Sequence, residues 1–177
     1  MGYISGVVVG TVKKVNDPNG EGRVLVQFPW MGGNNQSTWA PVATLMSGGG
    51  RGSWFMPEEE DEVLVAFDHD DVNHPYILGF LWNGKDKPPE TSSHKRMIKT
   101  VKGHTILWDD TDGSEKIEIV TGGGHRITLD DTSAGESITL KTVGGNQSIT
   151  LSDVTSSIEL QGGGRNLKMS NGLVQIS

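Results

Sequence analysis

The C-terminal part of the chain repeats a short apolar pattern. The first pair of aliphatic residues is Ile106 and Leu107, which are adjacent. In each later pair one other residue separates the two, as in Ile-Thr-Leu. Counted from Ile106, successive pairs begin 11, 10, 11, 11, 9, 9 and 7 residues apart. Side chains at positions i and i+2 lie on the same face of a β-strand, so each pair predicts a short strand with one apolar face. The pattern therefore predicts an array of short strands over residues 103–177.

The repeating unit is too small to cover its own apolar face. It consists of one strand and one turn, often rich in glycine as in VTGGGH, TVGGNQ and LQGGGR, whereas a single-chain solenoid uses roughly 20 residues or more in each coil. We therefore expect copies of the chain to wind about a common axis, where a fully buried aliphatic side chain contributes about 1.5–3 kcal/mol. The residues expected in this shared core are Ile117, Ile119, Ile127, Leu129, Ile138, Leu140, Ile149, Leu151, Ile158 and Leu160.

Five short apolar segments in the first half of the chain predict five strands. They are rich in Val, Phe and Trp, and turn-forming sequences such as NDPNGEG and SGGGRGS separate them. Apolar residues do not keep a helical spacing over ten residues, which argues against a long helix. Five short strands favour a small OB-type barrel, with a β-sandwich as the weaker alternative. The segments are residues 6–15, 22–30, 37–45, 61–70 and 74–82.

Aromatic residues and prolines divide the chain into two parts. Ten of the eleven aromatic residues precede the pair Pro88-Pro89, and only Trp108 follows it. Two consecutive prolines interrupt a regular strand and indicate a stiff connector. The expected domains are a barrel at residues 1–88, a connector at 89–102 and the strand array at 103–177.

Four blocks of the first half resemble a known family. The blocks NDPNGEGRVLVQFPW, STWAPVA, GRGSWFMPEEEDEVLVAF and NHPYILGFLWNG, in this order, are similar to the OB domain of contractile-tail spike proteins. These are phage baseplate assembly protein V and the matching part of VgrG in type VI secretion. One departure is Glu58-Glu59-Glu60, where many relatives carry a basic residue and a glycine before the Asp-Glu pair. The resemblance implies an OB barrel followed by a triple-stranded β-helix that three chains form together.

The resemblance also implies partners at both ends of the molecule. A baseplate hub is expected at the OB end, and it would be a separate protein if the chain is complete, because the hub domain that precedes the barrel in VgrG is absent. At the other end, relatives without a terminal fold-back or metal motif receive a PAAR-like tip protein. We expect such a protein to bind around Leu173, Val174 and Ile176.

Charge, cysteine content and hydropathy exclude several classes of protein. The formal net charge is −7 and the isoelectric point lies near 5.1, so we expect no nucleic-acid partner. The absence of cysteine excludes a disulfide framework and a thiolate metal site. No segment approaches the roughly 18 apolar residues of a membrane span, and the N-terminus lacks the pattern of a signal peptide. We expect a protein made in the cytoplasm that works in an assembled particle and can act outside the cell.

Two sets of acidic residues are candidates for chemistry, but we expect no catalytic residue, no metal site and no cofactor. The segment FDHDDVNHP lacks the spacing of a calcium-binding loop, which favours an exposed acidic hairpin loop. The pairs Asp109-Asp110 and Asp130-Asp131 invite comparison with the two carboxylates of a glycosidase. Adjacent side chains on a strand point apart, and both pairs fall in predicted turns, which favours a structural role.

His104 and His125 follow a glycine at equivalent positions of the repeat, so a trimer would gather each of them into a ring of three. Without a His-x-His motif we expect turn histidines rather than metal ligands. The four tryptophans of the first half could stack on bases or sugars, as in many OB folds. Because no basic groove accompanies them, we expect them in the core and at interfaces.

These patterns favour a mechanical function over a catalytic one. The leading hypothesis is the central spike of a contractile injection apparatus, in which sheath contraction drives a rigid needle through a target membrane. Intertwined strands without free edges would supply the rigidity. The alternative is a trimeric fibre that binds receptors or glycans, but no aromatic residue follows Trp108 to form such a site. An enzyme such as a cell-wall hydrolase would need a further domain, for which the sequence leaves no room between barrel and needle.

Overall fold

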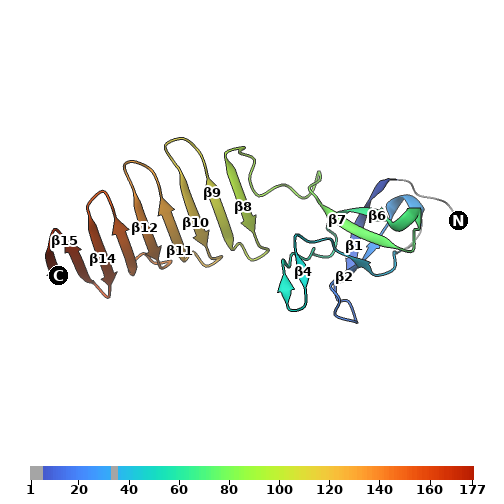
Figure 1. Ribbon diagram of the computed structural model, residues 1–177, viewed down its shortest axis with the longest axis horizontal. Coiled ribbons are helices and arrows are strands. Elements are labelled where there is room, and N and C mark those ends of the chain that lie inside the picture. Colours follow the sequence, from blue (N-terminus) through green and yellow to red (C-terminus); the bar gives the residue numbers. More distant parts are fainter. Residues whose placement is uncertain (1–5, 33–35) are drawn as a thin grey trace. The chain divides into compact units, whose positions relative to one another are not determined.

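The computed structural model describes residues 6–32 and 36–177 and divides the chain into two compact units. The first unit spans Met1–Lys87 and the second spans Pro88–Ser177. Both are built from β-strands, so the predicted all-β class is confirmed (Figure 1). Helical structure in the described residues is limited to two short 3-10 turns, and none of it could cross a membrane.

Five strands of the first unit form an antiparallel sheet that curls into an OB-like half-barrel. The strand order is β3-β2-β1-β6-β7, and a parallel bridge between Val42 and Ile77 connects the segment after β3 to β7. The elements are β1 (Val7–Lys14), β2 (Arg23–Gln27), η1 (Pro29–Met31), β3 (Ala40–Pro41), β6 (Glu62–Phe67), η2 (Asp68–Asp70) and β7 (Pro75–Leu81).

The third predicted strand is much shorter than expected. Of residues 37–45, only Ala40–Pro41 forms β3, because Pro41 has no N–H group to extend a ladder. The glycine-rich segment that we expected to be a turn instead forms a small separate hairpin of β4 (Ser47–Gly48) and β5 (Arg51–Gly52).

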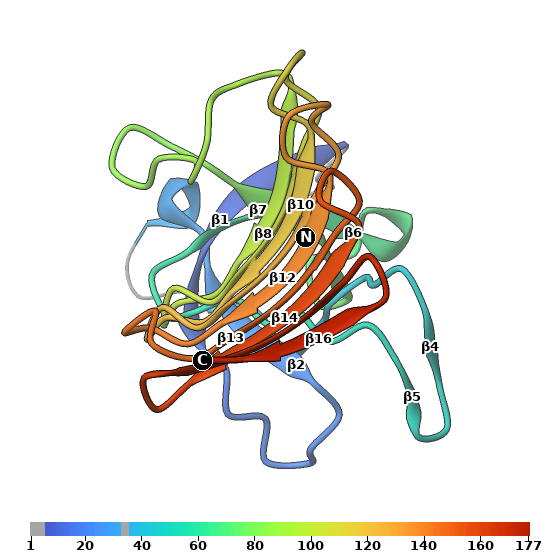
Figure 2. The ribbon, with the colours of Figure 1, turned by 90° about the vertical axis from the view of Figure 1, so that its left-hand side faces the viewer.

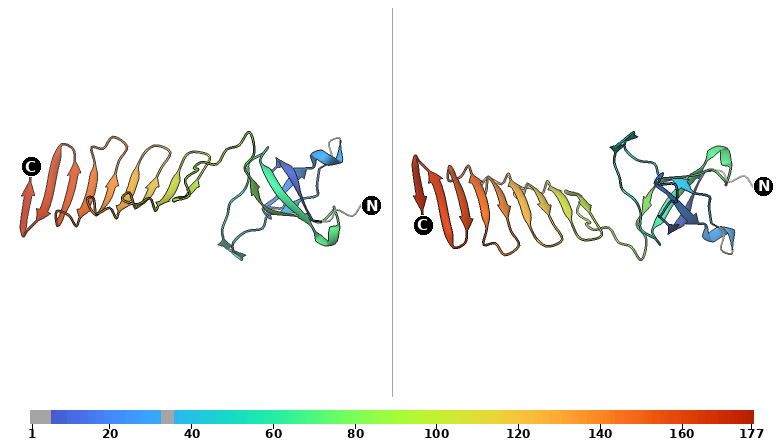
Figure 3. Two further views of the ribbon diagram at one scale, coloured as in Figure 1. Left: turned by 90° about the horizontal axis from the view of Figure 1, so that it is seen from above. Right: turned by 90° about the horizontal axis from the view of Figure 1, so that it is seen from below.

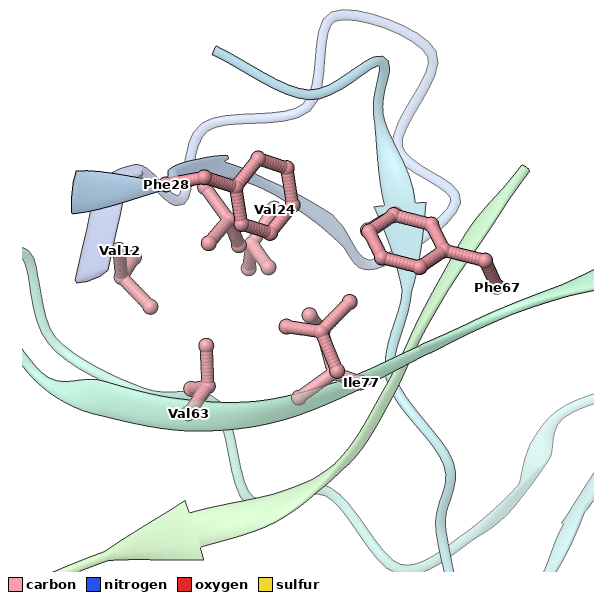
Figure 4. Packing of buried hydrophobic residues seen from close by; sticks show 9 residues of the cluster. Val12, Val24, Phe28, Val63, Phe67 and Ile77 are labelled. Atoms are coloured by element: carbon pink, nitrogen blue, oxygen red, sulfur yellow. The ribbon is translucent and has the colours of Figure 1, made fainter. Parts of the chain in front are cut away.

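The interior of the half-barrel contains the buried aliphatic and aromatic side chains of the described residues. Figure 4 shows side chains from β1, β2, β6 and β7 pointing toward one another, and the rings of Phe28 and Phe67 lie 5.6 Å apart. Gly10 allows β1 and β2 to approach closely, since a Cβ atom there would lie 2.3 Å from Cγ1 of Val26. The core residues are Val12, Val24, Val26, Phe28, Ala40, Val63, Val65, Phe67 and Ile77.

Nine strands of the second unit form one antiparallel meander in chain order. Each strand pairs only with its neighbours in the sequence, so the strands lie side by side like rungs (Figure 3). A view along the row shows that they are curved and turn gradually from one to the next (Figure 2). The strands are β8 (Lys95–Lys99), β9 (Thr105–Asp109), β10 (Lys116–Val120), β11 (Arg126–Asp130), β12 (Ser137–Lys141), β13 (Ser148–Ser152), β14 (Ser157–Gly162), β15 (Arg165–Ser170) and β16 (Leu173–Ile176).

The sheet begins earlier than the apolar pattern suggested. Strand β8 lies within residues 89–102, the segment assigned to the connector, and Ile98 pairs with Ile106 of β9. The strand escaped sequence analysis because Arg96 stands two positions before Ile98, where an aliphatic pair would have its other member.

Candidate functional site

The apolar residues of the array line up across the sheet in two ladders, which we call the aliphatic ladders. The antiparallel register places Leu129 opposite both Ile117 and Ile138, and this alignment continues from strand to strand. All ten residues expected in the shared core belong to these ladders. The first ladder consists of Trp108, Ile117, Leu129, Ile138, Leu151, Ile158, Met169 and Val174. The second consists of Ile98, Ile106, Ile119, Ile127, Leu140, Ile149, Leu160, Leu167 and Ile176.

No described part of the second unit covers the aliphatic ladders. From β10 to β14 every ladder side chain remains 36–43% exposed. A shallow apolar groove of about 460 Å³ runs along the second ladder. Among the described residues of the second unit, the buried side chains are polar: Asp109, Glu118 and Ser157. An aliphatic surface of this extent is typical of a surface that another chain covers.

The opposite face of the sheet carries polar residues in equally regular rows. Its central row places Thr139 between Thr128 and Thr150. An outer row on this face is a serine ladder, formed by Ser137, Ser152, Ser157 and Ser170. The contrast between the two faces identifies the aliphatic side as the one that has to turn away from water.

Buried charges on the polar face are paired. Glu118 is 9% exposed, and its Oε1 lies 3.0 Å from Nη1 of Arg126 and 3.7 Å from Nζ of Lys116. Asp109 is 6% exposed, and its Oδ2 lies 3.5 Å from Nζ of Lys95. Because each buried carboxylate has a cationic neighbour, these groups stabilise the polar face rather than mark a reactive site.

The three residues expected to bind a tip protein lie on β16, an edge strand of the sheet. Leu173, Val174 and Ile176 are 64%, 65% and 74% exposed. Val174 pairs with Met169 and Ile176 with Leu167, so both extend the aliphatic ladders. Leu173 pairs with Ser170 and therefore lies on the polar face.

The first residue of each acidic pair in the array, Asp109 or Asp130, caps a turn. Oδ1 of Asp109 accepts a hydrogen bond from the N–H of Thr111 at 3.1 Å, and Oδ1 of Asp130 accepts from the N–H and hydroxyl of Thr132 at 2.9 and 2.6 Å. Hydrogen bonds from these threonines lower the pKa of both carboxyl groups. Asp110 instead pairs with Arg96 at 2.8 Å, so neighbouring carboxylates have separate partners.

The acidic loop of the barrel forms two separate pairs. Nδ1 of His69 lies 2.7 Å from Oδ1 of Asp68, and Nδ1 of His74 lies 2.9 Å from Oδ2 of Asp71. The N–H of Asn73 and the ring of His74 lower the pKa of Asp71. Across residues 6–32 and 36–177, no three His, Cys, Asp or Glu side chains converge in a way that could hold a metal ion.

The two histidines of the array lie in turns at the same end of the strands, between β8 and β9 and between β10 and β11. Nδ1 of His104 accepts a hydrogen bond from the N–H of Gly122 at 3.2 Å, which joins two successive turns. The N–H of His125 donates to Oγ1 of Thr121 within its own turn at 3.0 Å. Both contacts stabilise turns.

The tryptophans of the first unit lie outside the barrel core, contrary to the core role that we expected for some of them. Trp30, Trp54 and Trp82 are 49%, 73% and 71% exposed, and Trp39 is half-buried. The interior is too narrow for them because aliphatic side chains from four strands and two phenylalanines already fill it. The ring of Trp54 instead lies against the turn at Gly22.

Comparisons with known proteins place these features in a family. Residues 8–82 match the type VI secretion system/phage-baseplate injector OB domain. Spike protein VgrG3 of the Vibrio cholerae type VI secretion system is 31% identical over 135 residues, which cover 64% of this chain and 13% of that protein. The actin cross-linking toxin VgrG1 of Vibrio cholerae is 28% identical over 133 residues, with 64% and 12% covered. Spike protein VgrG1a of Pseudomonas aeruginosa is 28% identical over 113 residues, with 55% and 18% covered.

The extent of these matches shows how much of the relatives' length the chain spans. It spans less than a fifth of the length of each of them. The matches to the two Vibrio proteins cover more of the chain than its first unit, which ends at Lys87, so they reach into the second unit. The chain therefore carries the injector OB domain at residues 8–82 and is similar to VgrG spike proteins over up to 64% of its length.

Proposed function

We propose that the chain forms part of the central spike of a contractile injection apparatus, in a phage tail, a type VI secretion system or a related extracellular particle. The observation that carries the proposal is the pair of aliphatic ladders, which are in register over eight and nine strands and are not covered by the described residues of their own unit. The VgrG-like OB domain supports the same function. In this function the second unit is a needle and the first unit attaches it to a baseplate hub protein.

The needle is a homotrimer in which three sheets turn their aliphatic ladders toward a common axis. Burying the part of each ladder side chain that is still exposed contributes on the order of 1 kcal/mol. With ten such residues from β10 to β14 in every chain, the gain is large enough to order a unit that has no apolar interior of its own. The polar rows then face outward.

The mechanism is mechanical and requires no cofactor or catalytic residue. A prism of backbone-paired strands resists bending, and its polar exterior lets it slide through surrounding protein and make transient contact with a target membrane. The edge strand β16, with its exposed Val174 and Ile176, receives a PAAR-like tip protein. The assembled particle is the place where the protein acts.

Native mass measurement of the full chain tests this proposal. We expect a particle of three times the chain mass of 19.0 kDa that persists on dilution, because interlocked chains must unwind together before they separate. A monomer at micromolar concentration would refute the trimeric needle and, with it, the proposed function.

A further inference from the structure

The turns of the second unit carry opposite charges at the two ends of its strands. Successive turns alternate between these ends, which we call the acidic end and the basic end (Figure 3). The turns of the acidic end contain six carboxylates and no basic residue: Asp110, Asp112, Glu115, Asp131, Glu136 and Asp153. The turns of the basic end and the residues beside them contain five cations and no carboxylate: Lys99, Lys102, Arg126, Lys141 and Arg165. Each end therefore fits a surface of the opposite charge.

Most of these charges have no partner within the sheet. Among the described residues, Asp110 forms an ion pair with Arg96 and Arg126 forms one with Glu118, whereas the remaining charges of the two ends form none. Successive turns of the acidic end hold three, two and one carboxylates, and the basic end has two cations at its first turn and one at each later turn. The two ends thus match in sign, and their charge falls in the same direction along the row of strands.

The two ends are also complementary in shape near the C-terminus. A groove of about 750 Å³ opens at the basic end between the β12–β13 turn and the β14–β15 turn. Glycines of both turns line it together with Val143, which is 65% exposed. At the same level of the acidic end the turn joins β13 to β14, and it carries Val154, which is 56% exposed.

We propose that the acidic end of each sheet packs against the basic end of the next copy, so that Val154 lies in the neighbour's groove beside Val143. This inference rests on the proposed trimeric needle. When three sheets turn their aliphatic ladders toward a threefold axis, rotation leaves the level of every turn unchanged. Each acidic end then meets a basic end at the same level. The occupant of the groove is therefore a second copy of this chain, selected by charge and by position.

This contact fixes the axial register of the chains, which the aliphatic ladders leave open. Strands β11, β12 and β13 all contain Ile-Thr-Leu at the same positions. A chain displaced by one hairpin along the axis would bury nearly the same side chains. Charges and turn shapes differ from one turn to the next, so only one register pairs them correctly. Exposed ion pairs add little stability individually, and their contribution here is to specificity.

A disulfide between neighbouring copies tests the contact in the full chain. The chain has no cysteine, so Val143→Cys with Val154→Cys introduces the only two thiols. Strand β13, which separates these two positions, has five residues and spans roughly 17 Å, whereas a disulfide requires Cα atoms within about 7 Å. A bond between them must therefore join two chains. We expect mild oxidation to give a covalent trimer on a non-reducing gel.

The control pair is Val101→Cys with Val154→Cys. Val101 is also an exposed valine at the basic end, but it lies in the β8–β9 turn, so this pair should stay unlinked. Charge is tested separately by adding Asp112→Asn, Asp131→Asn and Glu136→Gln to the first pair, which should slow its oxidation several-fold. Neutralising Glu58, Glu59 and Asp70 of the barrel changes the net charge equally and should leave the rate unchanged.

The outcomes separate this inference from the proposed function. A monomeric mass before oxidation overturns both. A trimer in which the thiols at positions 143 and 154 stay unlinked, or link no faster than those of the control pair, overturns only the contact between the two ends. A linked pair whose rate does not respond to the three neutralised carboxylates overturns the part of charge in setting the register.

Discussion

At the scale of single residues, Asp17 holds together the turn between β1 and β2. Its carboxylate is 2% exposed and accepts hydrogen bonds from Nε and Nη2 of Arg23 at 2.8 and 3.0 Å and from the N–H of Asn19 at 3.0 Å. Chiefly because of Arg23, the pKa of Asp17 lies well below the ordinary value of about 3.9. The ionised carboxylate therefore stabilises the fold above about pH 4, and this contribution is lost as the pH falls toward the lowered pKa.

We expect Asp17→Asn to lower the melting temperature of the barrel at pH 7 and to flatten its decline below about pH 4. Tryptophan fluorescence during thermal unfolding, recorded from pH 2 to pH 7, measures both effects. The control variant Glu21→Gln removes a 58% exposed partner of Arg23 and should change little. If the melting temperature of the variant declined below about pH 4 as steeply as that of the wild type, the role of Asp17 would be contradicted.

Glu60, in the turn before β6, has a strained backbone. Its φ of 76° lies in the left-handed region, which costs a residue with a side chain about 1–2 kcal/mol. Its ion pair with Nζ of Lys13, at 2.7 Å, is exposed and compensates only in part. We expect Glu60→Gly to raise the free energy of unfolding in denaturant by up to about 1 kcal/mol. The neighbouring variant Glu59→Gly has no such strain to relieve and should not stabilise the protein.

At the scale of elements, the effect of a substitution depends on whether the side chain lies on the aliphatic face of the sheet or in a turn. Ile138 lies in the first aliphatic ladder between Leu129 and Leu151. We expect Ile138→Asp to abolish the trimer in light scattering, because three carboxylates at a dry axis cost several kcal/mol each. Asp131→Ala, in the turn between β11 and β12, should leave the mass unchanged. Similar behaviour of the two variants would mean that the aliphatic face does not point inward.

The β8–β9 and β10–β11 turns, which lie at the same end of the strands, contact each other. A Cβ atom at Gly122 would lie 2.1 Å from the backbone oxygen of Lys102, so only glycine fits between the two turns. We expect Gly122→Ala to destabilise the second unit by about 1–3 kcal/mol, measured by thermal unfolding. Gly123→Ala is the matched control, since its Cβ would approach only Oγ1 of Thr121, at 3.9 Å. Equal effects of the two substitutions would contradict the close packing of the turns.

The regular spacing of aliphatic residues predicted the strands from β10 to β16 because each of these strands carries its own pair of apolar residues. Their alignment into aliphatic ladders depends on the register of each hairpin, which the sequence spacing alone does not give, because the turns shorten from six residues between β9 and β10 to two between β15 and β16. Strand β8 and the β4–β5 hairpin were missed, since β8 has one aliphatic residue on the ladder side and the hairpin is mostly glycine. The outward-facing apolar residues of β1 and β6 were present in the sequence as uninterrupted apolar runs, but only the strand pairing shows which of them lie together.

At the scale of the whole molecule, the two units differ in what stabilises them. The described residues of the barrel include a core cluster of nine buried aliphatic and aromatic residues, whereas those of the second unit include no buried apolar residue. Because association stabilises only the folded needle, its unfolding should depend on protein concentration, and that of the barrel should not. We therefore expect two thermal transitions for the full chain, and tenfold dilution should move only the needle transition to lower temperature.

A core variant assigns the two transitions. Ile77 is fully buried in the barrel, so Ile77→Ala should destabilise that unit by about 2–5 kcal/mol and leave the needle transition in place. Calorimetry at two protein concentrations, with this variant and the wild type, measures both effects. A single cooperative transition that moves as a whole, on dilution and in Ile77→Ala, would show that barrel and needle fold as one body.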